Sequence, residues 1–127
     1  MTIISFPNLA AFVGGRPYAD VKLNPTRLGV PTHKCLVDTG ADFLVLPASA
    51  AAASGLSLTR ATPFPLSSAT GPATMSILKG VPIEVEGYLV KVDVVFDPTN
   101  KCPPLAGRGS LLAAFKLGME SSDWHWT

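Results

Sequence analysis

Prolines and glycines constrain this chain more than any other residues, because they interrupt it repeatedly. Twelve prolines and eleven glycines are spread over 127 residues. Proline breaks helices, and both residues favour turns, so the pattern is typical of an all-β domain built from short strands. The length suits one domain and is too short for two. We therefore expect a single all-β domain with one core.

Several segments have the apolar patterns of strands. Residues 18–25 (YADVKLNP) alternate, and residues 32–40 (THKCLVDTG) are mostly apolar, which predicts a strand buried on both faces. Residues 80–96 predict a hairpin in which Gly87 marks the turn and Tyr88–Phe96 forms the second strand. The small, polar segment 65–78 predicts a longer hairpin, with a tip formed by Ala69, Thr70, Gly71 and Pro72.

Two short helices and a terminal strand complete the expected elements. Pro47 followed by an alanine-rich stretch predicts a helix over Ala48–Ser54, which Gly55 can end. A second helix is predicted near the C-terminus, with Ser110 as N-cap and Gly118 as the stop. The final residues, DWHWT, read as a strand. Residues 1–15 are predicted to form an N-terminal arm rather than a signal peptide.

Composition excludes several classes of protein. Charged residues make up 15% of the chain, hydrophobic residues 47%, and the net charge is +1. A nucleic-acid-binding domain normally presents a basic face, and a disordered chain is less apolar, so we expect neither. No apolar run approaches the roughly 18 residues of a membrane span. We expect a cytoplasmic protein with no membrane partner, in which the two cysteines, Cys35 and Cys102, are free thiols.

Two carboxylates occupy an unusual place in the segment KCLVDTGADFLVLP. Asp38 and Asp42 lie between two apolar strand-like runs. Burying an unpaired charge is costly, so each carboxylate needs a reason to be there. An Asp-Thr-Gly triplet alone is often a simple turn. Far downstream, however, residues 105–112 (LAGRGSLL) place two apolar residues and Gly107 directly before Arg108.

The order of these motifs resembles the retropepsin-like aspartic proteases, which are single-lobe relatives of pepsin. The resemblance runs from about Arg16 to Leu117 and is most specific at DTGAD, residues 38–42. It implies a closed acid-protease barrel over residues 16–127, with a flap hairpin, one short helix after the active-site loop and one short C-terminal helix. The alanine-rich helix is more similar to bacterial and other cellular members than to retroviral ones.

The resemblance also assigns roles to residues. Asp38 would be catalytic, supported by Thr39, Gly40 and Ala41, and Asp42 would form a structural, bidentate ion pair with Arg108. Peptide hydrolysis needs a base and an acid, which two adjacent carboxylates sharing one proton can supply together. The chain has one Asp-Thr-Gly motif, so the second carboxylate would come from a second copy in a two-fold homodimer.

The expected function is therefore that of an aspartic endopeptidase that acts on a peptide or protein substrate and needs neither a cofactor nor a metal. The alternative is a retropepsin-like module that binds peptide or dimerises without cleaving, because fold does not imply function. A third interpretation is a structural β-domain in which Asp38 lies in an ordinary turn. His33 and His125 are interpreted as structural.

Overall fold

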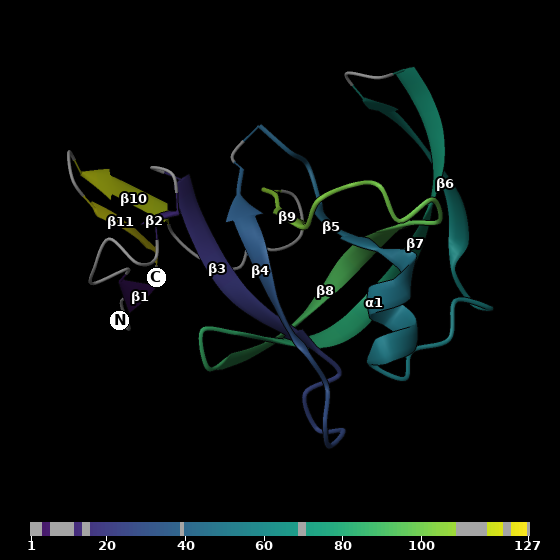
Figure 1. Cartoon of the computed structure of the whole chain (residues 1–127), viewed down its shortest axis with the longest axis horizontal. Helices are drawn as coiled ribbons and strands as arrows, with labels where there is room; N and C mark the ends of the chain where they lie inside the picture. Colours follow the sequence, from purple (N-terminus) through teal and green to yellow (C-terminus); the bar gives the residue numbers. More distant parts are fainter. Residues whose placement is uncertain are drawn as a thin grey trace.

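The computed structural model describes residues 4–5, 12–13, 16–38, 40–68, 71–108, 117–120 and 123–126. Over these residues the chain is mostly strand, with one short helix, which confirms the expected all-β class (Figure 1). The elements are β1 (Ile4–Ser5), β2 (Phe12–Val13), β3 (Arg16–Leu23), β4 (Thr32–Val37), β5 (Leu44–Pro47), α1 (Ala48–Ala53), β6 (Thr62–Ser68), β7 (Gly71–Val85), β8 (Tyr88–Asp97), β9 (Leu105–Ala106), β10 (Leu117–Glu120) and β11 (Asp123–Trp126).

Six of the described strands close into a barrel. These six strands are paired in the order β3-β4-β9-β5-β8-β7, and a further pairing of the first of them, β3, with the last, β7, closes the ring. That closing contact is antiparallel, with Val21 opposite Val85 and Leu23 opposite Ile83. Strands β2 and β6 extend the sheet beyond the ring. The architecture agrees with an all-β, retropepsin-like fold.

The barrel interior holds the main hydrophobic core. Its members come from every strand of the ring and from α1, and the largest fully buried side chains include Phe96, Leu23, Leu44, Leu46 and Ile83. Strand β4 corrects one expectation, because it is buried on one face and not on both. Cys35 and Val37 face the core, whereas Lys34 is exposed and Leu36 is only half-buried. Alternate residues of a barrel strand point inward and outward, so only one face of β4 reaches the core.

Helix α1 and the β7–β8 hairpin form where the sequence predicts them. Pro47 has φ −64° and immediately precedes α1, and the helix ends at Ala53, close to the predicted end at Ser54. Strands β7 and β8 form the expected hairpin, with Glu86 and Gly87 in the turn. Both turn residues have positive φ, 48° and 88°, as a tight hairpin turn requires. Within the described residues no helix is long and apolar enough to cross a membrane.

The β6–β7 hairpin projects beyond the barrel (Figure 1). β6 pairs with β7 from Thr62 opposite Ile77 to Ser68 opposite Gly71. Two residues of the predicted tip, Ala69 and Thr70, lie outside the described residues. The other two, Gly71 and Pro72, already belong to β7.

The chain ends form a separate three-stranded sheet in the order β1-β11-β10. β11 is the strand predicted for the final residues, and Ile4 of β1 lies opposite Trp126. Most of the C-terminal helix predicted between Ser110 and Gly118 lies outside the described residues. Gly118 does not end a helix, because it pairs with His125 within β10. The end of this segment therefore has strand pairing where the sequence predicts a helical stop.

Candidate active site

Asp38 stands at the end of β4, where the neighbouring strand fixes its backbone. β4 runs parallel to β9, with Val37 opposite Ala106. The N–H of Asp38 donates to the carbonyl of Ala106 at 3.0 Å, and the N–H of Leu36 donates to Pro104 at 3.0 Å. These bonds continue the ladder past the last strand residue. The half-buried Asp38 side chain is therefore presented by a rigid strand rather than by a free loop.

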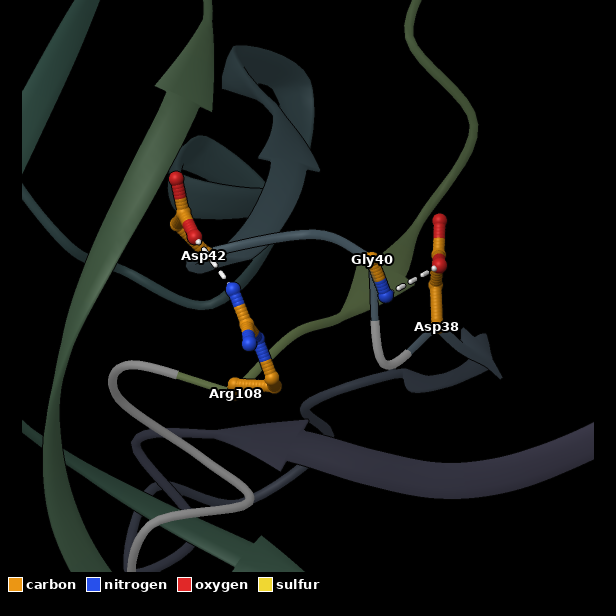
Figure 2. Close-up of polar contacts among 4 residues, drawn as sticks. All are labelled: Asp38, Gly40, Asp42 and Arg108. Carbon is orange, nitrogen blue, oxygen red and sulfur yellow. Dashed lines mark hydrogen bonds and ion pairs between the residues drawn. The ribbon is translucent and has the colours of Figure 1, made fainter.

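A tight turn follows Asp38 and directs an N–H at its carboxylate. The N–H of Ala41 donates to the carbonyl of Asp38 at 3.1 Å, and the N–H of Gly40 donates to Asp38 Oδ1 at 2.9 Å (Figure 2). A Cβ at position 40 would lie 3.2 Å from the same oxygen, so glycine allows this close approach. Thr39, predicted to support the loop, lies outside the described residues.

The segment from Leu105 to Arg108 passes directly behind this turn. β9 lies between β4 and β5, with Leu105 also opposite Val45. The N–H of Arg108 donates to the carbonyl of Ala41 at 2.8 Å. Gly107 is buried, and a Cβ there would lie 2.4 Å from the carbonyl oxygen of Phe43. No side chain fits at that distance, so the glycine of the apolar-apolar-Gly pattern has a steric cause.

Asp42 points toward Arg108 and away from Asp38 (Figure 2). Arg108 Nη2 donates to Asp42 Oδ1 at 3.2 Å. This is one hydrogen bond, not the two parallel bonds of the predicted bidentate pair. The Arg108 and Asp42 side chains are 63% and 65% exposed. Water screens such a pair, so within a single chain it contributes at most about 1 kcal/mol to stability.

Comparison with known protein families identifies the family of the chain. The model of a family described as aspartyl protease matches residues 20–120, which is most of the chain and includes the Asp38 turn, the β6–β7 hairpin and Arg108. The chain belongs to the aspartyl protease family. No curated protein sequence matches it.

This member of the aspartyl protease family has one further structured carboxylate, Asp97, which no sequence motif indicated as a site residue. Asp97 ends β8 and is only 3% exposed. Its oxygens accept from the Thr99 hydroxyl at 2.8 Å and from the N–H groups of Thr99, Lys101 and Cys102 at 2.9, 3.0 and 2.8 Å. Burial raises the pKa of this carboxyl, but the hydrogen bonds outweigh burial and hold the pKa below its ordinary value.

The Asp97 loop contacts β5 and α1, the two elements that follow the Asp38 turn in the chain. Asp97 pairs with Pro47 at the end of β5, and Asn100 Oδ1 accepts from the N–H of Ser49 at 3.0 Å in the first turn of α1. An aspartate directly followed by a proline favours a turn, and residues 97–98 carry this signal in the sequence. Asp97 thus organises a loop, and the hydrogen bonds described for its side chain all come from residues 99–102.

Both cysteines and His33 are buried or half-buried. Burial, with a smaller contribution from the charge of Asp20, raises the pKa of the Cys35 thiol to about 12. Burial, followed by the charge of Asp97, also raises the pKa of Cys102. Both cysteines are free, as expected. His33 Nε2 is buried with no hydrogen-bond partner among the described residues, and burial lowers the pKa of this histidine. The side chain of His125 lies outside the described part of the chain.

Acidic side chains also gather on the outer surface of β3 and β7. A shallow depression of about 290 Å³ is lined by Asp20, Lys22, Thr32, Glu84, Glu86 and Gly87. Lys22 Nζ lies 3.8 Å from Glu84 Oε2, and Glu86 Oε1 accepts from the N–H of Asp20. Two of the carboxylates are therefore engaged with protein groups. Among the residues described, no group of three or more His, Cys, Asp or Glu side chains is arranged to hold a metal ion.

Proposed function

We propose that the protein is an aspartic endopeptidase whose catalytic unit is a homodimer. Asp38 from each chain would stand at the two-fold axis and contribute one carboxylate to a shared dyad. The observation that carries the proposal is the environment of Asp38 in a member of the aspartyl protease family. The carboxylate is half-buried, fixed at a strand end and hydrogen-bonded to the N–H of Gly40.

The chemistry needs two carboxylates that share one proton. At a separation of about 3 Å they cannot both ionise, so the pair supplies a base for the attacking water and an acid for the substrate carbonyl. The base takes a proton from water as its oxygen bonds to the carbonyl carbon. The acid protonates the carbonyl oxygen, and collapse of the tetrahedral intermediate then transfers a proton to the leaving amine.

The second carboxylate is assigned to a second chain because other aspartates are engaged elsewhere. Asp42 is bonded to Arg108, Asp97 accepts from its own loop, and Asp93 Oδ1 accepts from the N–H of Gly80 at 3.0 Å. The sequence contains one Asp-Thr-Gly motif. A two-fold axis beside Asp38 would bring its symmetry mate into range. Thr39 would then join the two loops, and the small Ala41 would allow their close approach.

The remaining parts of the proposal concern substrate and assembly. An extended peptide would lie across the axis, with its alternate side chains in apolar pockets. The β6–β7 hairpin would act as a flap over it, with residues 69–72 at the tip, and would exclude water. The sheet β1-β11-β10 has two edge strands, β1 and β10, and strand edges of this kind can pair between subunits. The greater similarity to cellular than to retroviral members also remains a proposal.

The proposal is tested by cleavage of a quenched fluorescent peptide library at a protein concentration where sedimentation shows a dimer. We expect cleavage that pepstatin inhibits and that Asp38→Asn abolishes, since the amide is nearly isosteric but cannot act as the base. Near-UV circular dichroism and sedimentation of the variant should match those of the wild type. Cleavage retained by Asp38→Asn, or no cleavage by a confirmed dimer at any pH, would refute the proposal.

A further inference from the structure

Two phenylalanine rings join the Asp38 turn to the β6–β7 hairpin. Phe43 directly follows Asp42, and Phe64 lies in β6. Their ring centroids are 5.0 Å apart and the ring planes meet at 81°. This edge-to-face arrangement is attractive beyond the burial of the rings, because the positive edge of one ring meets the negative face of the other. The turn and the hairpin are thus in direct side-chain contact.

The two rings belong to a small hydrophobic cluster outside the barrel. Leu44 and Leu46 of β5 face the barrel core, whereas Val45 between them faces outward; Val95 of β8 likewise alternates with Val94 and Phe96. The outward-facing cluster comprises Val45, Met75, Ile77 and Val95, with Phe43, Phe64, Cys102 and Leu105 packed against them. The cluster therefore covers the outer face of the β5–β8 wall with the root of the hairpin.

The hairpin depends on this cluster for its position. β7 pairs with β8 from Ser76 onward, whereas its residues from Gly71 to Met75 pair with β6 alone among the described strands. A two-stranded ribbon is marginally stable by itself. Phe64 stands opposite Met75 at the point where the ribbon begins, and both belong to the cluster. Their packing therefore sets the direction in which the ribbon leaves the barrel.

Phe43 is held firmly at the other end of the contact. Its backbone N and O flank Gly107 so closely that an added Cβ would meet them at 2.6 and 2.4 Å. The segment after Gly107 is in turn bonded to the Asp38 turn through Ala41. A displacement of Phe64 would thus press on a ring whose backbone cannot move independently of that turn.

We propose that Phe43 and Phe64 form a positioning pair that couples the β6–β7 hairpin to the Asp38 turn. Given the proposed peptidase function, the pair would hold the hairpin over a bound peptide at a fixed height relative to Asp38. Neither ring would take part in the chemistry. Loss of the contact should weaken binding of the substrate and binding of the transition state equally. KM should therefore rise, and kcat should stay nearly unchanged.

The first arm of the test is hydrogen–deuterium exchange of the full chain and needs no activity. Phe43→Leu should speed exchange in the hairpin, and Phe64→Leu should speed exchange in residues 38–43, each by about 2- to 10-fold, the range expected for one aromatic contact. Phe64→Tyr keeps the aromatic ring and should therefore exchange at the wild-type rates. Val90→Ala is the matched control, because Val90 is half-buried against the barrel core and not in this cluster.

The second arm measures kinetics with a quenched fluorescent peptide that the wild type cleaves. We expect each leucine variant to raise KM by about 2- to 10-fold and the double variant to be no worse than the poorer single one. Val90→Ala should leave KM unchanged. If the wild type cleaves no peptide, the peptidase proposal fails, while the exchange arm still decides the coupling. Exchange changes confined to the mutated element, or equal effects of Val90→Ala, would overturn the positioning pair.

Discussion

The backbone of Gly107 packs against the backbone of Phe43 with no room for a side chain: a Cβ would lie 2.4 Å from Phe43 O and 2.6 Å from Phe43 N. Two segments far apart in the sequence therefore meet through main-chain atoms alone. This contact fixes the distance between the Asp38 turn and the strand behind it. It also predicts that position 107 tolerates no side chain.

Gly107→Ala is expected to destabilise the protein by about 3 kcal/mol or more, because backbone atoms cannot yield to a methyl group as side chains do. Urea denaturation measures the loss. Gly29→Ala is the control: Gly29 has φ +78° but nothing within 4 Å of an added Cβ, so it should cost only about 1 kcal/mol. Equal losses in the two variants would contradict the steric account of Gly107.

Asp97→Asn is expected to lower stability at pH 7 by about 1.5–3 kcal/mol, since hydrogen bonds to a buried charge are replaced by weaker ones. The pKa of Asp97 is lower in the folded protein than its ordinary value of 3.8. Its contribution is therefore complete above about pH 4 and is lost as the pH falls through the folded-state pKa.

Stability curves measured from pH 7 to pH 2 check this prediction. The difference between wild type and Asp97→Asn should shrink below about pH 4. Thr99→Val removes only the hydroxyl donor and should show a smaller loss at neutral pH, with the acid dependence retained. A difference that is constant over the whole pH range would show that the charge of Asp97 is not the stabilising feature.

Asp42→Ala and Arg108→Ala are each expected to cost less than about 1 kcal/mol in a dilute, monomeric sample, because the pair is exposed. A double-mutant cycle measures their coupling. In the proposed dimer a second chain could cover the pair, so the coupling should grow at protein concentrations above the dimer dissociation constant. Strictly additive losses at both concentrations would mean that the ion pair contributes nothing.

The rate of peptide cleavage should have a bell-shaped pH dependence with its maximum on the acidic side of neutral. Activity should fall at low pH, where both carboxyls of the dyad are protonated, and at higher pH, where the shared proton is lost. The profile is measured well above the dimer dissociation constant, so that dissociation does not distort it. A rate that keeps rising through pH 8 would contradict the dyad.

Deletion of residues 122–127 should shift the protein toward monomer and lower activity in parallel. The deletion removes β11, the central strand of the β1-β11-β10 sheet, and with it the partner of both proposed edge strands. Sedimentation velocity measures the assembly, and circular dichroism shows whether the barrel persists. A truncated protein that dimerises as tightly as the full chain would mean that the terminal sheet is not part of the interface.

The sequence determined the local features of this protein, because those features depend on residues close together in the chain. Pro47 and the following alanines predict α1, Gly87 predicts the turn between β7 and β8, and the Asp-Thr-Gly triplet marks the turn at Asp38. In each case a few neighbouring residues restrict the backbone enough to choose one conformation. The expected family was identified on the same basis, from short motifs and their order.

The tertiary structure decided what depends on register between distant segments. Closure of the barrel through Val21 and Val85 and the packing of Phe43 on Phe64 appear in no local pattern. The burial of Asp97 also follows from tertiary packing, because this residue is 3% exposed where the end of β8 pairs with Pro47 of β5. A shift of one residue in a strand pairing would turn alternate side chains to the opposite face, so these contacts exist only in the folded barrel.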